Sequence, residues 1–162
     1  MSDKLVKNLN FGSDAKSKIL KGIDKLTNAV SSTLGASGKC VILEDQHGQP
    51  SITKDGVTVA EAITLLDPVE NIGATLLKDA ARKTVKEAGD GTTTATVLAN
   101  EILTLACVVD DNNTRSIKEG INSGVKKVIT YLEKISIPVK DEMVKQVATI
   151  SANNDIELGE KI

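Results

Sequence analysis

A short stretch in the middle of the chain carries the residue types that bind a phosphate group and a metal ion. Residues 88–96 read Ala-Gly-Asp-Gly-Thr-Thr-Thr-Ala-Thr, so two glycines flank one carboxylate and three threonines follow. Gly89 and Gly91 allow a tight turn with positive φ and a close approach of backbone to a ligand. The threonine run predicts the start of a helix, whose first N–H groups have no partner inside it. Because these N–H groups and the helix dipole attract anions, the turn predicts a phosphate site to which the threonine hydroxyls add donors.

Asp90 indicates what kind of phosphate compound would fit. A carboxylate repels a bare phosphate, but a divalent cation between the two removes the conflict, and Mg²⁺ prefers such oxygen ligands. The stretch alone therefore predicts a Mg-nucleotide site. An ordinary helix–helix turn stays open as an alternative, with Gly89 ending one helix and Asp90 or Thr92 capping the next for roughly 1 kcal/mol.

The composition narrows the class of protein. The chain has 162 residues with 20 basic and 22 acidic side chains, enough for one domain with a sizeable core. No basic stripe is visible, and only Phe11 and Tyr131 are aromatic, so we expect no nucleic-acid partner. Without an apolar run of roughly 20 residues we expect no membrane partner. Met1–Asn10 shows no signal-peptide pattern, and Cys40 and Cys107 stand in no ligand spacing, which favours a cytoplasmic protein without disulfide or zinc.

Helical periodicity dominates the chain and predicts a mainly α fold. The first helix is expected to begin with Ser13 or Asp14 as its N-cap and to end at Gly35. Its apolar face recurs at spacings of three and four residues; the face consists of Ile19, Ile23, Leu26, Val30 and Leu34.

Two short segments read as strands. Lys4–Phe11 is expected to form a short strand or arm, and Cys40–Leu43 and Ser51–Thr53 are expected to pair as a β-hairpin across a Gly-containing turn. After the hairpin, Val57–Leu66 is predicted to be largely helical.

The remaining helices have readable ends. Asp67-Pro68 opens a helix that ends at Gly89, and the very apolar helix after the Gly-Asp-Gly turn is expected to be buried on most sides. Thr114 is the expected cap of the cleanest amphipathic helix in the chain. Asp141 and Asp155 are expected to cap the last two helices.

Familiar enzyme templates do not match. The chain has neither a G-x-x-x-x-G-K-[ST] nor a G-x-G-x-x-G motif, and His47 is its single histidine. Three turns remain, at Thr33–Gly35, Thr53–Gly56 and Gly89–Thr94. Together they offer backbone groups, a cation with a carboxylate, and a phosphate-and-metal loop, which are the parts of a nucleoside triphosphate site. A small-molecule phosphotransferase is a weaker alternative because no acceptor site is evident.

These turns resemble the N-terminal part of the group I chaperonins, the GroEL-like ATP-driven protein-folding machines. The resemblance runs over essentially all 162 residues. Its most specific segments are Thr33–Gly35, Ile52–Val57, Ala88–Ala99 and Thr149–Asn153, in the family order.

The resemblance implies a role for each matching position. Asp90 would hold Mg²⁺, and a K⁺ ion would help to hold the phosphates. Asp55 would support hydrolysis near the attacking water. The nucleotide itself would be bound by Thr33, Leu34, Gly35, Lys54, Gly91, Thr92, Thr93, Thr94 and Ser151.

The resemblance also implies an architecture: a multihelical chaperonin equatorial-type domain with a short N-terminal strand and one β-hairpin. Residues 1–137 would form the N-terminal half of the equatorial, ATP-binding domain, and residues 138–162 the start of an intermediate domain. The N-terminal arm and the hairpin would contact neighbouring subunits of a homo-oligomeric ring. The sequence departs from the family at Ala36, where a proline is usual, and around Leu105–Asn113, where it is shorter.

A helix that opens at Asp155 and reaches the end of the sequence at Ile162 leads us to expect a truncated chain. The apical domain, which would bind unfolded clients and a co-chaperonin, the principal catalytic aspartate and the second equatorial half would be absent. We therefore expect an ATP-dependent chaperone subunit whose 162 residues alone are weak or inactive as an ATPase. A non-catalytic module that binds chaperonin subunits without turnover is the alternative.

Overall fold

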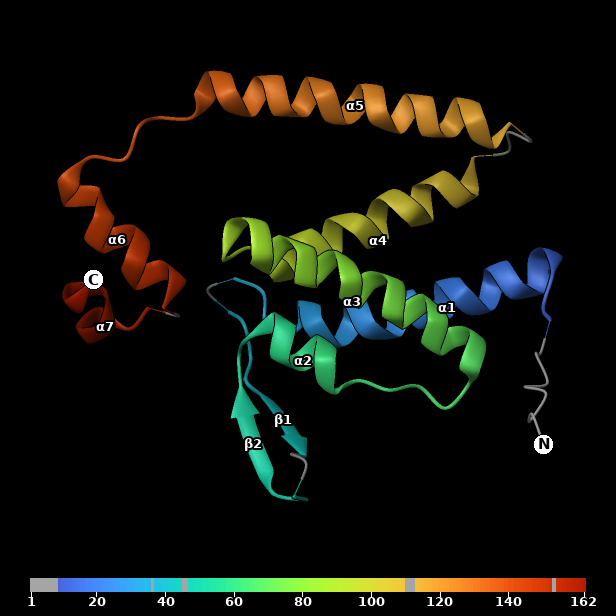
Figure 1. The fold of residues 1–162 in the computed structure, drawn as a ribbon, viewed down its shortest axis with the longest axis horizontal. Coiled ribbons are helices and arrows are strands. Elements are labelled where there is room, and N and C mark those ends of the chain that lie inside the picture. The colour runs from blue at the N-terminus through green and yellow to red at the C-terminus, as the bar shows by residue number, and fades with distance from the viewer. Residues whose placement is uncertain (1–8, 36, 45–46, 110–112, 153) are drawn as a thin grey trace, which may run out of the picture. The chain divides into compact units, whose positions relative to one another are not determined.

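The computed structural model describes residues 9–35, 37–44, 47–109, 113–152 and 154–162 (Figure 1). These residues divide into two compact units, within 1–104 and 105–162. The elements, in chain order, are α1 (Gly12–Ser31), β1 (Val41–Glu44), β2 (Pro50–Thr53), α2 (Gly56–Ala62), α3 (Pro68–Ala88), α4 (Thr92–Val108), α5 (Thr114–Ile135), α6 (Asp141–Ser151) and α7 (Ile156–Lys161). The predicted mainly helical fold with one hairpin is confirmed. Most of the expected N-terminal strand, together with Ala36, residues 110–112 and Asn153, lies outside the described residues.

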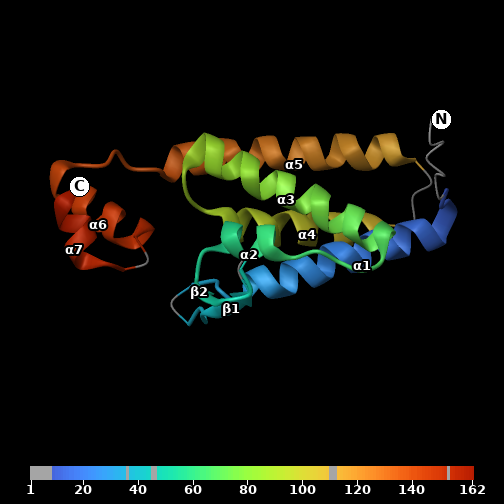
Figure 2. The ribbon, with the colours of Figure 1, turned by 60° about the horizontal axis from the view of Figure 1, so that its bottom comes forward.

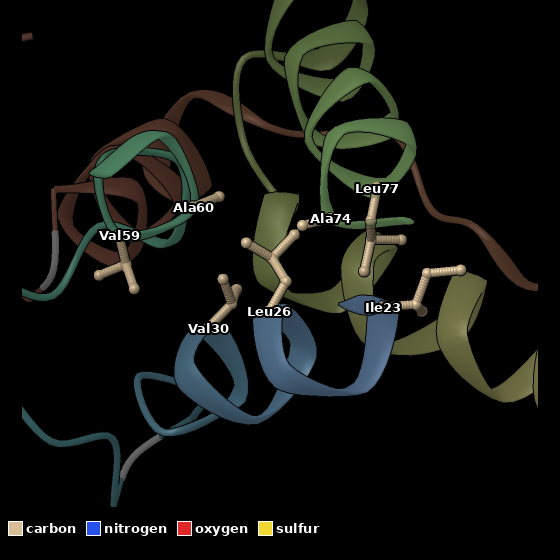
Figure 3. Packing of buried hydrophobic residues seen from close by; sticks show 7 residues of the cluster. All are labelled: Ile23, Leu26, Val30, Val59, Ala60, Ala74 and Leu77. Carbon is tan, nitrogen blue, oxygen red and sulfur yellow. The ribbon is translucent and has the colours of Figure 1, made fainter. Parts of the chain in front are cut away.

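The first unit is built around α1 and α3, which lie side by side, with the short α2 against both (Figures 1 and 2). The apolar face predicted for the first helix supplies three of the seven buried members of this core, because its spacing places one side chain on the same face at every turn. Figure 3 shows the buried cluster, whose members are Ile23, Leu26, Val30, Val59, Ala60, Ala74 and Leu77.

Helices α1 and α3 approach each other so closely that only glycine fits at two points. A Cβ on Gly22 would lie 1.8 Å from the carbonyl oxygen of Glu70, and a Cβ on Gly73 would lie 2.1 Å from that of Ile19. Lys25 pairs with Glu70 beside the crossing, at 2.5 Å. The two glycines, which the periodicity analysis did not single out, therefore fix where one helix meets the other.

The ends of α3 form as predicted. The Asp67 carboxylate accepts hydrogen bonds from the backbone N–H groups of Val69 and Glu70, and Gly89 ends the helix at φ 78°. A glycine at this position avoids the steric cost that a Cβ meets in the left-handed region. The turn that leads into the candidate site is therefore fixed by local sequence.

Three predicted caps are wrong, by one to three residues. Phe11 is the N-cap of α1 without a side-chain hydrogen bond, and Gly12, with φ 67°, is the first residue of the helix ahead of Ser13 and Asp14. Asn113, not Thr114, caps α5: its side chain accepts hydrogen bonds from two backbone N–H groups, and asparagine is the stronger N-cap residue.

Helix α6 also begins earlier than predicted. Lys140 is its N-cap without a side-chain hydrogen bond, so Asp141 is the first helical residue. The expected cap of α7 is confirmed, since the Asp155 carboxylate accepts a hydrogen bond from the N–H of Leu158.

The hairpin pairs β1 and β2 in antiparallel register, with Val41 opposite Thr53 and Glu44 opposite Pro50. It forms a two-stranded sheet in the described part of the chain, and Val41 and Leu43 pack against the core cluster. Both strands are therefore edge strands of that sheet. The helix after the hairpin is shorter than predicted, because the backbone turns extended at Ile63.

Helix α4 is not buried on most sides, so this prediction is wrong. Its buried residues are Thr92, Thr96 and Asn100, which recur every four residues along one polar stripe. Its large apolar side chains are mostly exposed instead; these include Leu98, Ile102, Leu103, Leu105 and Val108. The polar side of the helix faces the protein, and an apolar surface is left open.

The second unit contains α5, α6 and α7. No described residue of α5 is buried, although it is strongly amphipathic. Helices α6 and α7 cross at Gly159, where a Cβ would lie 2.0 Å from Oγ1 of Thr149, and Lys145 pairs with Glu160 at 2.6 Å. Among the described residues, every helix is too short or too polar to cross a membrane.

Candidate nucleotide-binding site

The candidate site forms where the end of α1, the start of α2 and the start of α4 meet. The Thr33 hydroxyl donates to the carbonyl oxygen of Val30 at 2.7 Å and lies 3.4 Å from the hydroxyl of Thr93. Since the single hydroxyl proton of Thr33 is already used, the Thr93 hydroxyl is the donor between them. Two predicted site residues that stand 60 positions apart in the sequence are therefore in contact.

Gly56, the first residue of α2, closes this junction. A Cβ at this position would lie 2.2 Å from Oγ1 of Thr93, 3.4 Å from Oγ1 of Thr92 and 3.3 Å from Cγ1 of Val30. Only a residue without a side chain lets α2 begin against the threonine turn. The motif containing Lys54 and Asp55 is thereby brought next to the start of α4.

The Gly-Asp-Gly turn leaves space for a ligand. Gly89 and Gly91 have φ values of 78° and 81°, and a Cβ on either would meet no atom within 4 Å. The Asp90 carboxylate accepts a hydrogen bond from the N–H of Gly91 at 2.6 Å. The turn therefore presents backbone and a carboxylate to an open side of the first unit, directly before the N-terminal end of α4.

The three threonines of the turn differ in burial. Thr92 is buried, Thr93 is half-buried beside Thr33, and Thr94 is exposed. The carbonyl of Thr92 accepts the hydroxyl of the buried Thr96 at 2.8 Å, which ties the first turn of α4 to the polar stripe. The hydroxyl of Thr94 is the exposed threonine hydroxyl of the turn, whereas the N–H of Gly91 is hydrogen-bonded to Asp90 and its carbonyl accepts the N–H of Ala95.

Asp55 has a structural role that the sequence analysis missed. It is the N-cap of α2, and its Oδ2 accepts the N–H of Thr58 at 2.8 Å and the Thr58 hydroxyl at 2.6 Å. The signal was present, because aspartate three residues before threonine at the start of an apolar run is a helix N-terminus pattern. Asp55 and Lys54 are both exposed at the edge of the junction.

The segment after α1 forms the third part of the candidate site, beside the starts of α2 and α4. Gly35 has φ 73°, and its carbonyl accepts the N–H of Gly38, while the N–H of Lys39 donates to the carbonyl of Ser32. Leu34 exposes 43% of its surface beside this tight turn. An exposed leucine next to a buried threonine is suited to contact the less polar part of a nucleotide.

Ser151 is the last residue of α6 and belongs to the second unit. The structure leaves its place relative to the junction undefined, so its assignment to the nucleotide site stays a prediction.

The side chains at the turn fit a Mg²⁺ ion that is bound together with a nucleotide, but they do not fit a Mg²⁺ ion that is held by several protein carboxylates. Among the described residues no group of three or more His, Cys, Asp or Glu side chains could hold a metal ion. Mg²⁺ commonly takes one carboxylate and completes its shell with phosphate oxygens and water. Asp90, exposed beside the open backbone of Gly91, fits this nucleotide-dependent mode.

The helical unit, with its Gly-Asp-Gly-Thr turn at a helix start, places the chain in the mainly α class of proteins, and comparison with known proteins identifies the family. Residues 26–161 match the model of the TCP-1/cpn60 chaperonin family. The chain therefore belongs to the TCP-1/cpn60 chaperonin family.

Solved structures agree with this assignment. The chaperonin gp146 from the bacteriophage EL 2 (Pseudomonas aeruginosa), crystallised in the presence of ATP-BeFx in two crystal forms, is 33% identical with a TM-score of 0.78 in both. The match covers 93% of this chain and 27% of the phage protein. The chain thus spans about a quarter of the length of these structural relatives.

Proposed function

We propose that this chain supplies the phosphate and Mg²⁺ side of the ATP site of an ATP-dependent chaperonin subunit that assists protein folding. The observation that carries the proposal is the junction of Thr33, Gly56 and Thr93 beside the open Asp90 turn. The positive-φ glycines, the helix start and the exposed Asp90 carboxylate at this turn support the binding of a Mg-phosphate group.

Each site residue has a place in this proposal. The backbone of Gly91 and the three threonines that follow it cradle the phosphates. Lys54 supplies a positive charge near them, and Asp55 supports hydrolysis. The turn at Thr33–Gly35 lines the nucleotide, and Ser151, in the second unit, stays a predicted nucleotide-binding residue.

The proposal extends to domains and partners. Residues 1–137 would be the first half of an equatorial domain and residues 138–162 the start of an intermediate domain. The edge strands β1 and β2 would pair with a neighbouring subunit of a ring, because exposed strand edges offer unpaired backbone groups. Binding of clients and of a co-chaperonin would require an apical domain, and these residues alone would turn ATP over feebly.

Titration with a non-hydrolysable Mg-ATP analogue tests the site. Asp90→Ala removes the carboxylate proposed to hold Mg²⁺, so we expect about tenfold or greater loss of affinity, in line with one lost interaction of a charged group. The parent chain should lose affinity when EDTA removes Mg²⁺, and the variant should be insensitive to EDTA. Asp24→Ala, which removes an exposed carboxylate from α1, should bind like the parent.

If Asp90→Ala and the parent bind the Mg-ATP analogue equally well, Asp90 does not hold Mg²⁺. The same titration in K⁺ and in Na⁺ tests the proposed monovalent ion, for which the expected result is tighter binding in K⁺.

A non-catalytic module that pairs with chaperonin subunits is the second candidate. The specific observation in its favour is the open apolar surface of α4 and α5 among the described residues. Stable association with chaperonin subunits, combined with no nucleotide binding, would favour this candidate.

A further inference from the structure

Lys78 is a buried lysine on α3 for which the site described above has no use. It exposes only 9% of its surface, among the apolar residues of the helix that face the core. Its ammonium group donates hydrogen bonds to the backbone carbonyls of Glu61, at 3.2 Å, and of Ile63. A buried ammonium group is costly unless it is paired, so these two carbonyls account for its placement.

The two carbonyls lie at the C-terminal end of α2. Glu61 is in the last turn of the helix, and Ile63 is its C-cap. The carbonyl groups at the C-terminal end of a helix have no N–H partner within the helix, so they can accept hydrogen bonds from a lysine. A cation at this end also interacts favourably with the helix dipole. Arg82 reinforces the same end from the exposed side, where it binds the Glu61 carboxylate through two nitrogens at 2.5 and 2.6 Å.

The opposite end of α2 belongs to the candidate site. There Asp55 caps the helix and Gly56 lies against Thr93. With seven residues, α2 is too short to be stable on its own, so its position depends on its attachments. Between the two ends, only Val59 and Ala60 are fully buried in the core cluster.

We propose that Lys78 is a positioning residue for the proposed phosphate site: by capping the C-terminal end of α2, it holds the start of that helix, where Asp55 is the N-cap, so that Gly56 lies against the threonine turn of α4. Its effect on nucleotide rests on the proposed function, whereas its effect on α2 does not. Lys78 touches neither Asp55 nor the turn, and it acts through the helix.

Hydrogen exchange in the full chain, followed residue by residue, tests this role. The N–H of Thr58 donates to Oδ2 of Asp55, and the N–H of Val59 donates to the carbonyl of Asp55 at 3.0 Å, so both amides report the state of the α2 start. In Lys78→Met we expect these two amides to exchange about tenfold faster, as for the loss of one hydrogen bond to a charged group. Core amides of α1 should keep their protection.

Lys83→Met is the matched control. Lys83 lies on the same helix, its side chain is 74% exposed, and its nearest acidic partner, Glu87, is 3.9 Å away. This variant should leave the exchange of Thr58 and Val59 unchanged. Lys78→Gln, which keeps a polar N–H group at the buried position, is the second variant and should show the same local pattern with a smaller change.

Nucleotide titration gives the second readout, in which Lys78→Met should bind the Mg-ATP analogue about tenfold more weakly than Lys83→Met. Unchanged exchange at Thr58 and Val59, or an equal rise at every amide, would overturn the positioning role. A local change in exchange without a change in affinity would overturn the link to the site. If the parent chain itself does not bind the analogue, the proposed function fails while the exchange result still decides how α2 is held.

Discussion

The contact between Gly56 and Thr93 depends on a side chain that is missing. A glycine that begins a helix usually costs stability, because its backbone is free in the unfolded chain. At this position the cost is offset by the approach of α2 to the threonine turn, since any Cβ would lie 2.2 Å from Oγ1 of Thr93. The residue type is therefore set by a neighbour 37 positions away rather than by local helix propensity.

The variant Gly56→Ala tests whether packing against Thr93, rather than helix propensity, determines the residue at this position. Either Thr93 or the start of α2 must move, so we expect a destabilisation of about 1–3 kcal/mol, as for overpacking, together with weaker binding of the Mg-ATP analogue. Urea unfolding and the titration measure the two effects. Gly120→Ala on α5, where a Cβ meets nothing within 4 Å, is the control and should be neutral or stabilising. Equal stability of Gly56→Ala and the parent would show that the junction is loose in solution.

The sequence predicted the local geometry of the Gly-Asp-Gly turn, whereas its binding of phosphate stays a prediction. The positive-φ glycines, the helix start at Thr92 and the carboxylate between them follow from local rules that act over a few residues. The sequence could not predict that Thr33 touches Thr93 or that Gly56 lies against Thr93, because these contacts depend on how helices far apart in the chain pack. Lys78 was missed for the same reason, although a single cation on an apolar helix face was a visible signal.

At the scale of elements, α2 is attached to α3 by one buried and one exposed cation. The exposed pair of Arg82 and Glu61 lowers the pKa of the Glu61 carboxyl below its ordinary value of 4.5, chiefly through the hydrogen bond that Arg82 donates. A carboxyl whose pKa is lower in the folded state stabilises the fold above its unfolded pKa. That contribution is lost as the pH falls through the folded pKa.

We therefore expect the free energy of unfolding of Glu61→Gln to depend less on pH in the acid range than that of the parent. Between about pH 7 and about pH 3 the parent should lose more stability than the variant, by less than about 1 kcal/mol because both side chains are partly exposed. Urea unfolding at several pH values measures the difference. Arg82→Met should flatten the profile in the same way, and a Glu61→Gln profile parallel to that of the parent would show that the pair is not formed in solution.

Element boundaries show where sequence rules were too coarse. The helices were predicted in the right order, but three caps moved: Asn113 is a better cap than Thr114, whereas α1 and α6 begin after residues whose side chains make no cap hydrogen bond. The burial of α4 was predicted from its apolar content, yet the face that meets the core is the polar one. Composition alone does not indicate which side of an apolar helix finds a partner.

At the scale of the whole molecule, the described residues expose a large amount of apolar surface. Val125, Val128, Ile129, Leu132 and Ile135 lie along α5 with 43–57% of their surface exposed. Apolar patches of this kind mark interaction surfaces in soluble proteins. We therefore expect the chain to self-associate or to bind a partner through this helix.

Light scattering tests this expectation, and the scattering mass of the parent should exceed 17.1 kDa. Val128→Lys combined with Leu132→Lys places charges on the apolar face of α5 and should shift the chain towards the monomer. Glu119→Gln combined with Glu133→Gln changes the net charge equally on exposed acidic positions of the same helix and should leave the association intact. A parent chain that scatters as a monomer at high concentration would contradict the prediction.

The glycine crossing of α1 and α3 sets a register as well as a contact. Because carbonyl oxygens occupy the space of a Cβ at Gly22 and Gly73, the two helices meet at one offset and cannot slide by a turn. From that point α3 runs without interruption to Gly89 and delivers the Asp90 turn at a set distance and angle. Adding or removing one residue in this span would shift the turn by about 1.5 Å and rotate it by about 100° around the helix axis. The length of α3 thus sets the position of the Asp90 turn. The number of residues between Gly73 and Gly89 is therefore constrained, even where their side chains are free to vary.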